Sequence, residues 1–190
     1  RQGLKDKWDE MNTKRSSLVD DSEDAWDDVK DEMEDGWKDI SIADFTVSPD
    51  LILVFGGNNA LKDKIHFDTI RSWYPKSNIV SASTAGEIIG TDVSDDSIVL
   101  TAIKFEKTTL KFTEASVTSV DQSEEIGKKL ASGLPKDDLS HVMIFSDGLY
   151  INGTPLVKGL LSELPKDVSV TGGLAGDGAR FKETLVGFNN

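Results

Sequence analysis

Short apolar runs alternate with stretches of helical periodicity between Leu51 and Phe188, and this alternation limits the region to the α/β class of folds. Strands are predicted at 51–55, 78–83, 141–145, 168–170 and 183–188, and those at 51–55 and 141–145 are expected to be buried. Helices are predicted at 60–74, 121–134 and 154–164, where apolar residues recur every three or four positions. With two further strands the order is β-α-β-β-β-α-β-α-β-β, which predicts a mixed β-sheet with flanking helices.

The two further strands, residues 97–105 and 109–117, show a partial alternation of apolar and polar residues. Lys104 and Lys111 each stand between two apolar residues. This alternation predicts an antiparallel pair with one solvated face.

Capping residues predict where two of the helices begin. Asp121 and Glu124 have the spacing of a capping box, so a helix is expected to start there. Thr154 is expected to cap the following helix, with Pro155 as its first residue.

The first 45 residues follow a different pattern and form a predicted domain separate from residues 46–190. Their apolar residues are spaced by three, four or seven positions, which predicts one long acidic amphipathic helix. Its apolar face needs cover from the following domain, a partner helix or a second copy. We expect a helix–helix contact of the coiled-coil type, and hence a homo-oligomer through this helix. The residues that define the face are Leu4, Trp8, Met11, Leu18, Ala25, Trp26, Val29, Met33, Trp37 and Ile40.

The charge of the chain restricts its partners. A net charge of −13 argues against nucleic acid and against anionic membrane surfaces, since both attract basic patches. No stretch of about 18 apolar residues and no signal-peptide core are present, so we expect a cytoplasmic protein without a membrane span. Cysteine is absent, which removes disulfides, zinc–thiolate sites and a cysteine nucleophile.

Four loops rich in small and polar residues each follow a predicted strand. They span residues 56–59, 83–87, 147–152 and 171–178. Ligands of open α/β sheets bind beyond the carboxyl ends of strands, so these loops are the predicted binding region. The glycine-dense TGGLAGDG segment lacks both the Walker A ending and the dinucleotide-binding spacing, which disfavours a phosphate cradle.

Three of these segments resemble signature segments of one known family. SASTAGEI at 81–88, DGLYIN at 147–152 and GGLAGDGARF at 172–181 resemble, in the same order, motifs in the N-terminal part of the FIST family. The resemblance spans residues 50–188. It implies a bacterial sensory input module that binds small ligands such as amino acids and acts on a signalling output protein or domain. The C-terminal half of the family is expected to be absent from this chain.

The resemblance places the ligand site on three of the loops. Glu87 and Asp177 are predicted to hold a ligand ammonium group, and Thr84 and Asn152 a ligand carboxylate. Stabilisation of their own loops is the alternative role for the two acidic residues. The full set of predicted ligand-binding residues is Thr84, Gly86, Glu87, Asp147, Gly148, Asn152, Gly172, Gly173, Gly176 and Asp177.

Three other functions compete with ligand sensing. A hydrolase could use a triad of Ser83 or Ser146 with a histidine and an Asp, but no G-x-S-x-G elbow is present. A hydrolase could instead use the carboxylates of Glu87 and Asp177 for acid–base chemistry. We expect no enzyme. Some FIST members are reported to sense gas through haem, for which His66 is the better axial candidate and His141 the weaker. The third alternative is an interaction protein whose long helix is the functional part. The sequence does not identify a cofactor.

Overall fold

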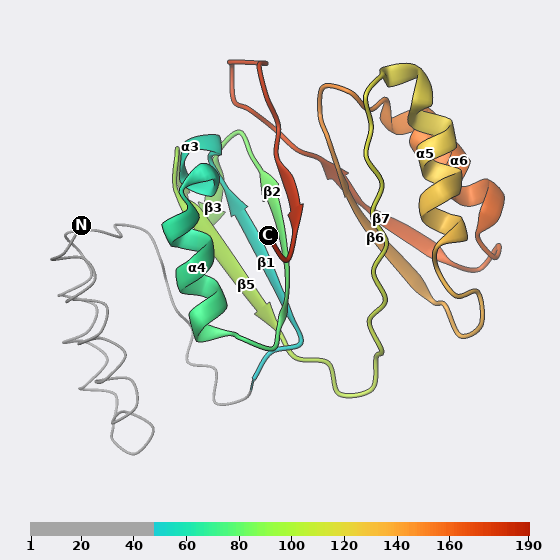
Figure 1. Cartoon of the computed structure of the whole chain (residues 1–190), viewed down its shortest axis with the longest axis horizontal. Helices are drawn as coiled ribbons and strands as arrows, with labels where there is room; N and C mark the ends of the chain where they lie inside the picture. The colour runs from blue at the N-terminus through green and yellow to red at the C-terminus, as the bar shows by residue number, and fades with distance from the viewer. Residues whose placement is uncertain (1–47) are drawn as a thin grey trace, which may run out of the picture. The chain divides into compact units, whose positions relative to one another are not determined.

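Two α/β layers, each with its helices on the outer side, face each other in the computed structural model, which describes residues 48–190 (Figure 1). The predicted helix of residues 1–45 lies outside the described residues. In the first layer a mixed four-stranded sheet has the order β5-β1-β2-β8. Its strands are β1 (Leu51–Gly56), β2 (Asn78–Ser83), β5 (Ile98–Ile103) and β8 (Val186–Phe188). β1 pairs parallel with β2, while β5 and β8 add antiparallel edges.

Two short helices cover the outer face of this sheet, α3 (Asn58–Lys62) and α4 (Lys64–Trp73). Buried Ile52, Val54 and Ile79 pack against them. The prediction of one helix over 60–74 is wrong in one respect, because the structure has two helices in this region. Asp63 interrupts it, because its carboxylate accepts the Ile65 N–H (3.0 Å) and caps α4.

The second layer contains the parallel pair β6 (His141–Ser146) and β7 (Ser169–Leu174), covered by α5 (Ser123–Ser132) and α6 (Gly153–Glu163). The side chains of Val142, Leu156 and Leu160 are buried between the strands and the helices. This layer holds a hydrophobic core of its own, separate from the core of the first layer.

The predicted antiparallel pair of 97–105 and 109–117 is wrong. β5 pairs with β1 instead, and the described chain passes through 109–117 without a strand. Asp50 gives the physical reason, because its carboxylate binds the Phe105 N–H (2.9 Å) and Lys104 Nζ (2.7 Å) directly after β5. Phe112, from the expected second strand, stacks on Phe188 of β8 with ring centres 4.7 Å apart.

A short hairpin, β3 (Glu87–Ile89) and β4 (Asp92–Ser94), was not predicted. The sheet prediction is thus confirmed as mixed and flanked by helices among residues 48–190, but the strands divide into three sheets. In this described part, no helix combines the length and the apolar character that a membrane crossing requires.

Both predicted helix caps are displaced by a few residues. The capping box is formed by Ser119 and Gln122, which open a short 3₁₀ turn (η1, Val120–Gln122) before α5. Glu124 instead forms an ion pair with Lys158 of α6 (2.8 Å).

The cap of α6 is Asn152, whose side-chain oxygen accepts the Thr154 N–H at 3.2 Å.

Candidate functional site

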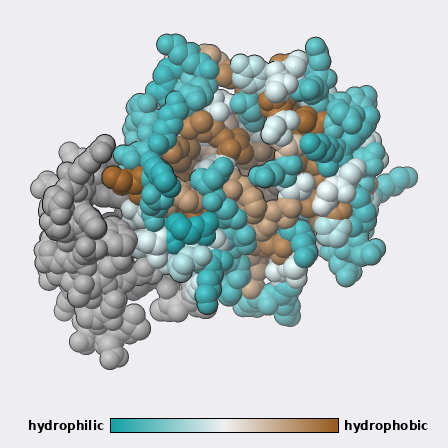
Figure 2. Space-filling model, viewed as in Figure 1, coloured by the Kyte–Doolittle hydropathy of each residue, from teal (hydrophilic) through white to brown (hydrophobic). Residues whose placement is uncertain are grey.

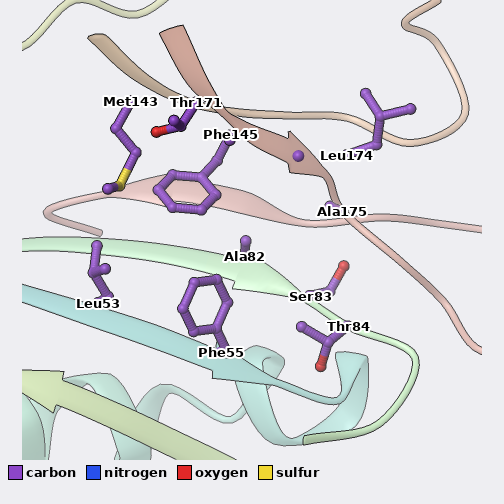
Figure 3. Close-up of a pocket in the computed structure, with 12 residues that line it drawn as sticks. Leu53, Phe55, Ala82, Ser83, Thr84, Met143, Phe145, Thr171, Leu174 and Ala175 are labelled. Atoms are coloured by element: carbon purple, nitrogen blue, oxygen red, sulfur yellow. The ribbon is translucent and has the colours of Figure 1, made fainter. Parts of the chain in front are cut away.

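A cleft of about 400 Å³ lies between the inner faces of the two layers (Figure 3). Hydrophobic side chains gather in the middle of this face of the molecule (Figure 2). All twelve described residues that line the cleft are uncharged. They are Leu53, Phe55, Ala82, Ser83, Thr84, Met143, Phe145, Thr171, Gly172, Gly173, Leu174 and Ala175.

The alternation of side chains along the strands explains this apolar lining. Ile52 and Val54 point to the helices of the first layer, so Leu53 and Phe55 point to the opposite face. Phe55 meets Phe145 of the second layer edge to face, with ring centres 5.6 Å apart and planes inclined by 64°. Aromatic pairs prefer this geometry, which connects the two layers and forms one wall of the cleft.

Hydroxyl groups supply the polar part of the lining. Thr171 Oγ1 lies 2.8 Å from Nε2 of His141, whose Nδ1 lies 2.7 Å from Ser169 Oγ. Both nitrogens of the exposed imidazole are thus paired with hydroxyl groups. Thr84, from the first layer, donates its hydroxyl to the Glu87 carboxylate.

Three of the ten predicted ligand-binding residues line the cleft, namely Thr84, Gly172 and Gly173. Gly172 has a φ of +143°, and a Cβ there would lie 1.8 Å from the Ile144 carbonyl oxygen, so the position requires glycine. At Gly173 a Cβ would meet no atom within 4 Å. Gly173 and Val170 are three positions apart on β7, so they point to opposite faces of the strand. Because Val170 packs on the helices, Gly173 faces the open cleft.

The loop after β7 is tied to the end of β2 through Ser83, which is almost fully buried. Its hydroxyl donates to the Gly176 carbonyl (2.7 Å) and accepts the Leu185 N–H (2.9 Å). Its backbone bonds the same two residues, with Gly176 N–H to Ser83 O and Ser83 N–H to Leu185 O both at 2.8 Å. Gly176 is therefore a structural link between the two layers in this structure.

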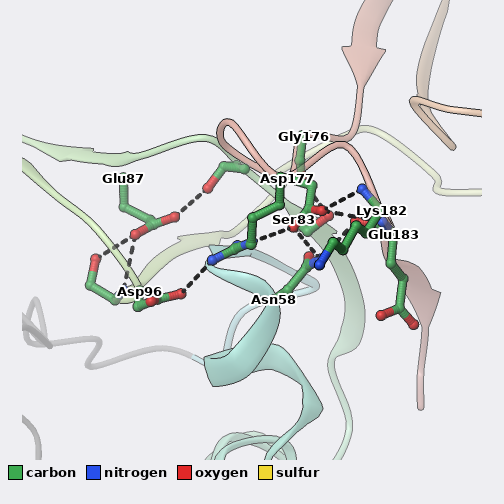
Figure 4. A network of polar contacts seen from close by, with 11 residues as sticks. Asn58, Ser83, Glu87, Asp96, Gly176, Asp177, Lys182 and Glu183 are labelled. Carbon is green, nitrogen blue, oxygen red and sulfur yellow. Dashed lines mark hydrogen bonds and ion pairs between the residues drawn. The ribbon is translucent and has the colours of Figure 1, made fainter.

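Asp177, only 6 % exposed, is the centre of a polar network within this loop (Figure 4). One carboxylate oxygen accepts Asn58 Nδ2 (2.7 Å) and Arg180 Nε (2.8 Å). The other accepts the backbone N–H groups of Lys182 (2.9 Å) and Glu183 (3.2 Å). The Lys182 N–H, and next the Arg180 side chain, lower the pKa of Asp177 from 3.8 to about 2, so the carboxylate is ionised at neutral pH.

Glu87 is buried in a neighbouring network that also holds a loop. Its carboxylate accepts the N–H (3.0 Å) and the hydroxyl (2.8 Å) of Ser97, as well as the Thr84 hydroxyl. Gly86, with φ +133°, bends the chain between Thr84 and Glu87. The carboxylates of Glu87 and Asp177 both have internal partners, which corresponds to the loop-stabilising alternative. Their ligand roles stay predictions.

The predicted residues of the third loop also bond within the protein. Asp147 accepts the Leu149 N–H (2.7 Å) and the Thr184 hydroxyl (2.6 Å). Gly148 donates its N–H to the same hydroxyl (3.0 Å), and Asn152 caps α6 as described above. None of these three residues is among the described residues that line the cleft.

The sequence prediction did not include the aromatic and apolar lining, such as Phe55, Met143 and Phe145. The alternation within LILVF and HVMIF carried that signal, because every second residue of a strand must face away from its helices. Asn58 lies in the predicted loop 56–59 but was not among the individual residues predicted to bind the ligand. It is 5 % exposed, and its side-chain oxygen has no hydrogen-bond partner among the described residues.

A family model described as FIST N domain matches residues 50–190. No curated protein and no solved structure matches the chain.

Proposed function

This chain belongs to the FIST family, whose domains are in general sensory domains of signal transduction, and on that premise we propose that it binds a small ligand in the cleft between its two layers. Amino acids and related metabolites are the ligand class that we propose first. Binding, rather than turnover, is the proposed activity. A separate signalling protein or domain would read the bound state.

The observation that supports this proposal is the position of the family motifs relative to the cleft. Thr84, from the first motif, and Gly172 and Gly173, from the third, come from different layers and line the same cleft. Its volume of about 400 Å³ is within the range of small-molecule sites. Such sites combine a mainly apolar lining with a few polar groups, which this cleft also does.

The residues predicted for the two competing chemical functions lie outside the described cleft lining. Glu87 and Asp177 do not line it within the described chain, and internal hydrogen bonds engage their carboxylates. A hydrolase that used this pair would first have to break both networks. Neither histidine is among the described lining residues, and His66 Nδ1 lies 2.7 Å from the Ala60 carbonyl. The lining therefore does not fit an axial histidine for haem.

A thermal-shift screen of the whole chain with amino acids, related metabolites, nucleotides and haem tests the proposal. A ligand that binds the folded form raises the unfolding midpoint, and the rise grows with ligand concentration. Gly173→Leu would project a side chain into the cleft and should abolish the rise. Gly153→Leu is the matched control, since Gly153 also has open space at its Cβ but lies outside the cleft lining. A rise that persists in Gly173→Leu would contradict the proposed site.

A further inference from the structure

We propose that the ligand of this cleft is an uncharged and largely apolar molecule, with a ring or branched body and one hydroxyl, carbonyl or N–H group. This inference rests on the proposed function and narrows it. It excludes free amino acids, which carry both an ammonium and a carboxylate group, and selects related metabolites that lack these charges. The observation that carries it is the composition of the lining.

A charged ligand would find no ionic partner among the described lining residues. Seven of the twelve are apolar side chains, three carry a hydroxyl and two are glycines. Moving an ion from water into such surroundings is costly unless an opposite charge or several hydrogen bonds replace its hydration. A zwitterion would need such replacement at both of its ends.

The acidic residues nearest in sequence to the cleft do not supply this replacement. Asp147 follows the lining residue Phe145, yet its carboxylate accepts the Leu149 N–H and the Thr184 hydroxyl. Glu87 follows the lining residue Thr84, yet its oxygens accept bonds from Thr84 and Ser97. Asp177 follows Ala175, yet four internal donors bind its carboxylate. A ligand ammonium group could reach either carboxylate only by displacing a partner that holds a loop in place.

The apolar body of the ligand has defined contacts available. Phe55 and Phe145 are half-buried and meet edge to face, so their remaining ring surface can pack against a flat or branched group. Met143 and Leu174 are each 50 % exposed. Burial of such apolar surface favours binding. The flexible thioether of Met143 can adapt to the shape of the ligand.

One polar group of the ligand can be satisfied at Thr171. Its hydroxyl is paired with a nitrogen of His141, and the direction of that hydrogen bond depends on the imidazole tautomer. The pair can therefore present either a donor or an acceptor to the cleft. A neutral hydroxyl, carbonyl or ring N–H matches this contact without bringing a charge.

Calorimetric titration of the whole chain with three probes that share one ring system tests the inference. The probes are indole, indole-3-acetate and L-tryptophan, which are uncharged, anionic and zwitterionic. We expect saturable binding of indole at about one site per chain. We expect affinity for the two charged probes to be at least about tenfold lower, because their charges lose hydration without gaining a partner.

The same titrations on cleft variants separate this inference from the proposed function. Gly173→Leu should lose at least about tenfold in indole affinity, while Gly153→Leu should keep the wild-type value. Gly173→Ala, a smaller change, should lose less, and thermal unfolding confirms that each variant folds.

Equal or tighter binding of a charged probe that Gly173→Leu blocks would overturn the neutral-ligand inference and leave the proposed function standing. Indole binding that Gly173→Leu does not affect would overturn the assignment to this cleft. Absence of binding by all three probes would overturn the apolar ligand class, and the wider ligand screen would then decide the proposed function.

Discussion

Asp177 shows what the acidic residue of the GGLAGDGARF segment does in the folded chain. Its two oxygens accept four hydrogen bonds, and two of the donors are backbone N–H groups of its own loop. A carboxylate can accept this many bonds only when it is ionised, because a protonated oxygen becomes a donor. The loop geometry and the low pKa of Asp177 thus have the same cause.

This residue should make stability depend on pH in the acid range. The pKa of Asp177 falls from 3.8 to about 2 on folding, chiefly through the Lys182 N–H and the Arg180 side chain. Because the pKa is lower in the folded chain, the ionised carboxylate stabilises the fold. Its contribution is complete above about pH 4 and is lost as the pH falls toward 2.

Urea unfolding of the wild type and of Asp177→Asn between pH 7 and pH 2 measures this effect. The variant should be less stable at pH 7, and the difference in unfolding free energy should narrow between about pH 4 and pH 2. Asp68→Asn is the control, since Asp68 forms an exposed i,i+4 pair with Lys64. A difference for Asp177→Asn that stays constant down to pH 2 would show that the loop does not depend on this ionisation.

Close approach of two helices governs packing in the second layer. A Cβ at Gly159 of α6 would lie 2.0 Å from the Glu124 carbonyl oxygen, and one at Gly127 of α5 would lie 2.2 Å from the Leu156 carbonyl oxygen. The glycines therefore let α5 and α6 pack backbone to backbone. Intrinsic helix propensity favours alanine over glycine at both positions. The close contact between the two helix backbones leaves no room for the methyl group of alanine.

Gly159→Ala should destabilise the chain by about 1–3 kcal/mol, because the added methyl group forces the helices apart. Propensity alone predicts the opposite sign, a gain of up to about 1 kcal/mol. Gly153→Ala, in the same helix with open space at its Cβ, should show no loss. Denaturant unfolding of the two variants measures both values, and equal stability of the two would refute the packing argument.

Helices and strands whose conformation depends on residues close together in the sequence could be predicted. β1, β2 and β6 follow from apolar runs rich in β-branched residues, and α5 and α6 follow from helical spacing. The segment 109–117 has equally good alternation but forms no strand. Long-range contacts decide its conformation, because Phe112 stacks on Phe188, which is 76 residues away (188 − 112).

The candidate site likewise has parts that local sequence could predict and parts that depend on long-range contacts. The family motifs contain three of the residues that line the cleft, Thr84, Gly172 and Gly173. The contact between Phe55 and Phe145, which forms another part of the lining, depends on how the two layers face each other. No pattern within either strand specifies that pairing.

At the scale of the whole molecule, residues 48–190 contain two hydrophobic cores that remain separate. Between them, Ser83 bonds the loop after β7, and Phe55 meets Phe145. Each core is complete with its own helices, so the inner faces are free to line a cleft rather than a third core. A ligand bound in the cleft, as proposed, would contact both layers at once, and its binding could then change how the layers interact.

The predicted helix of residues 1–45 provides the last test, on the assembly of the whole chain. Three tryptophans, Trp8, Trp26 and Trp37, fall on its apolar face, while the overall charge of −13 argues against membranes as the cover. We therefore expect light scattering to give about twice the 20.7 kDa mass of one chain. Removal of residues 1–45 should give single chains that still unfold cooperatively, since both described cores lie beyond residue 47. An unchanged assembly after the deletion would place the contact between copies on residues 46–190 instead.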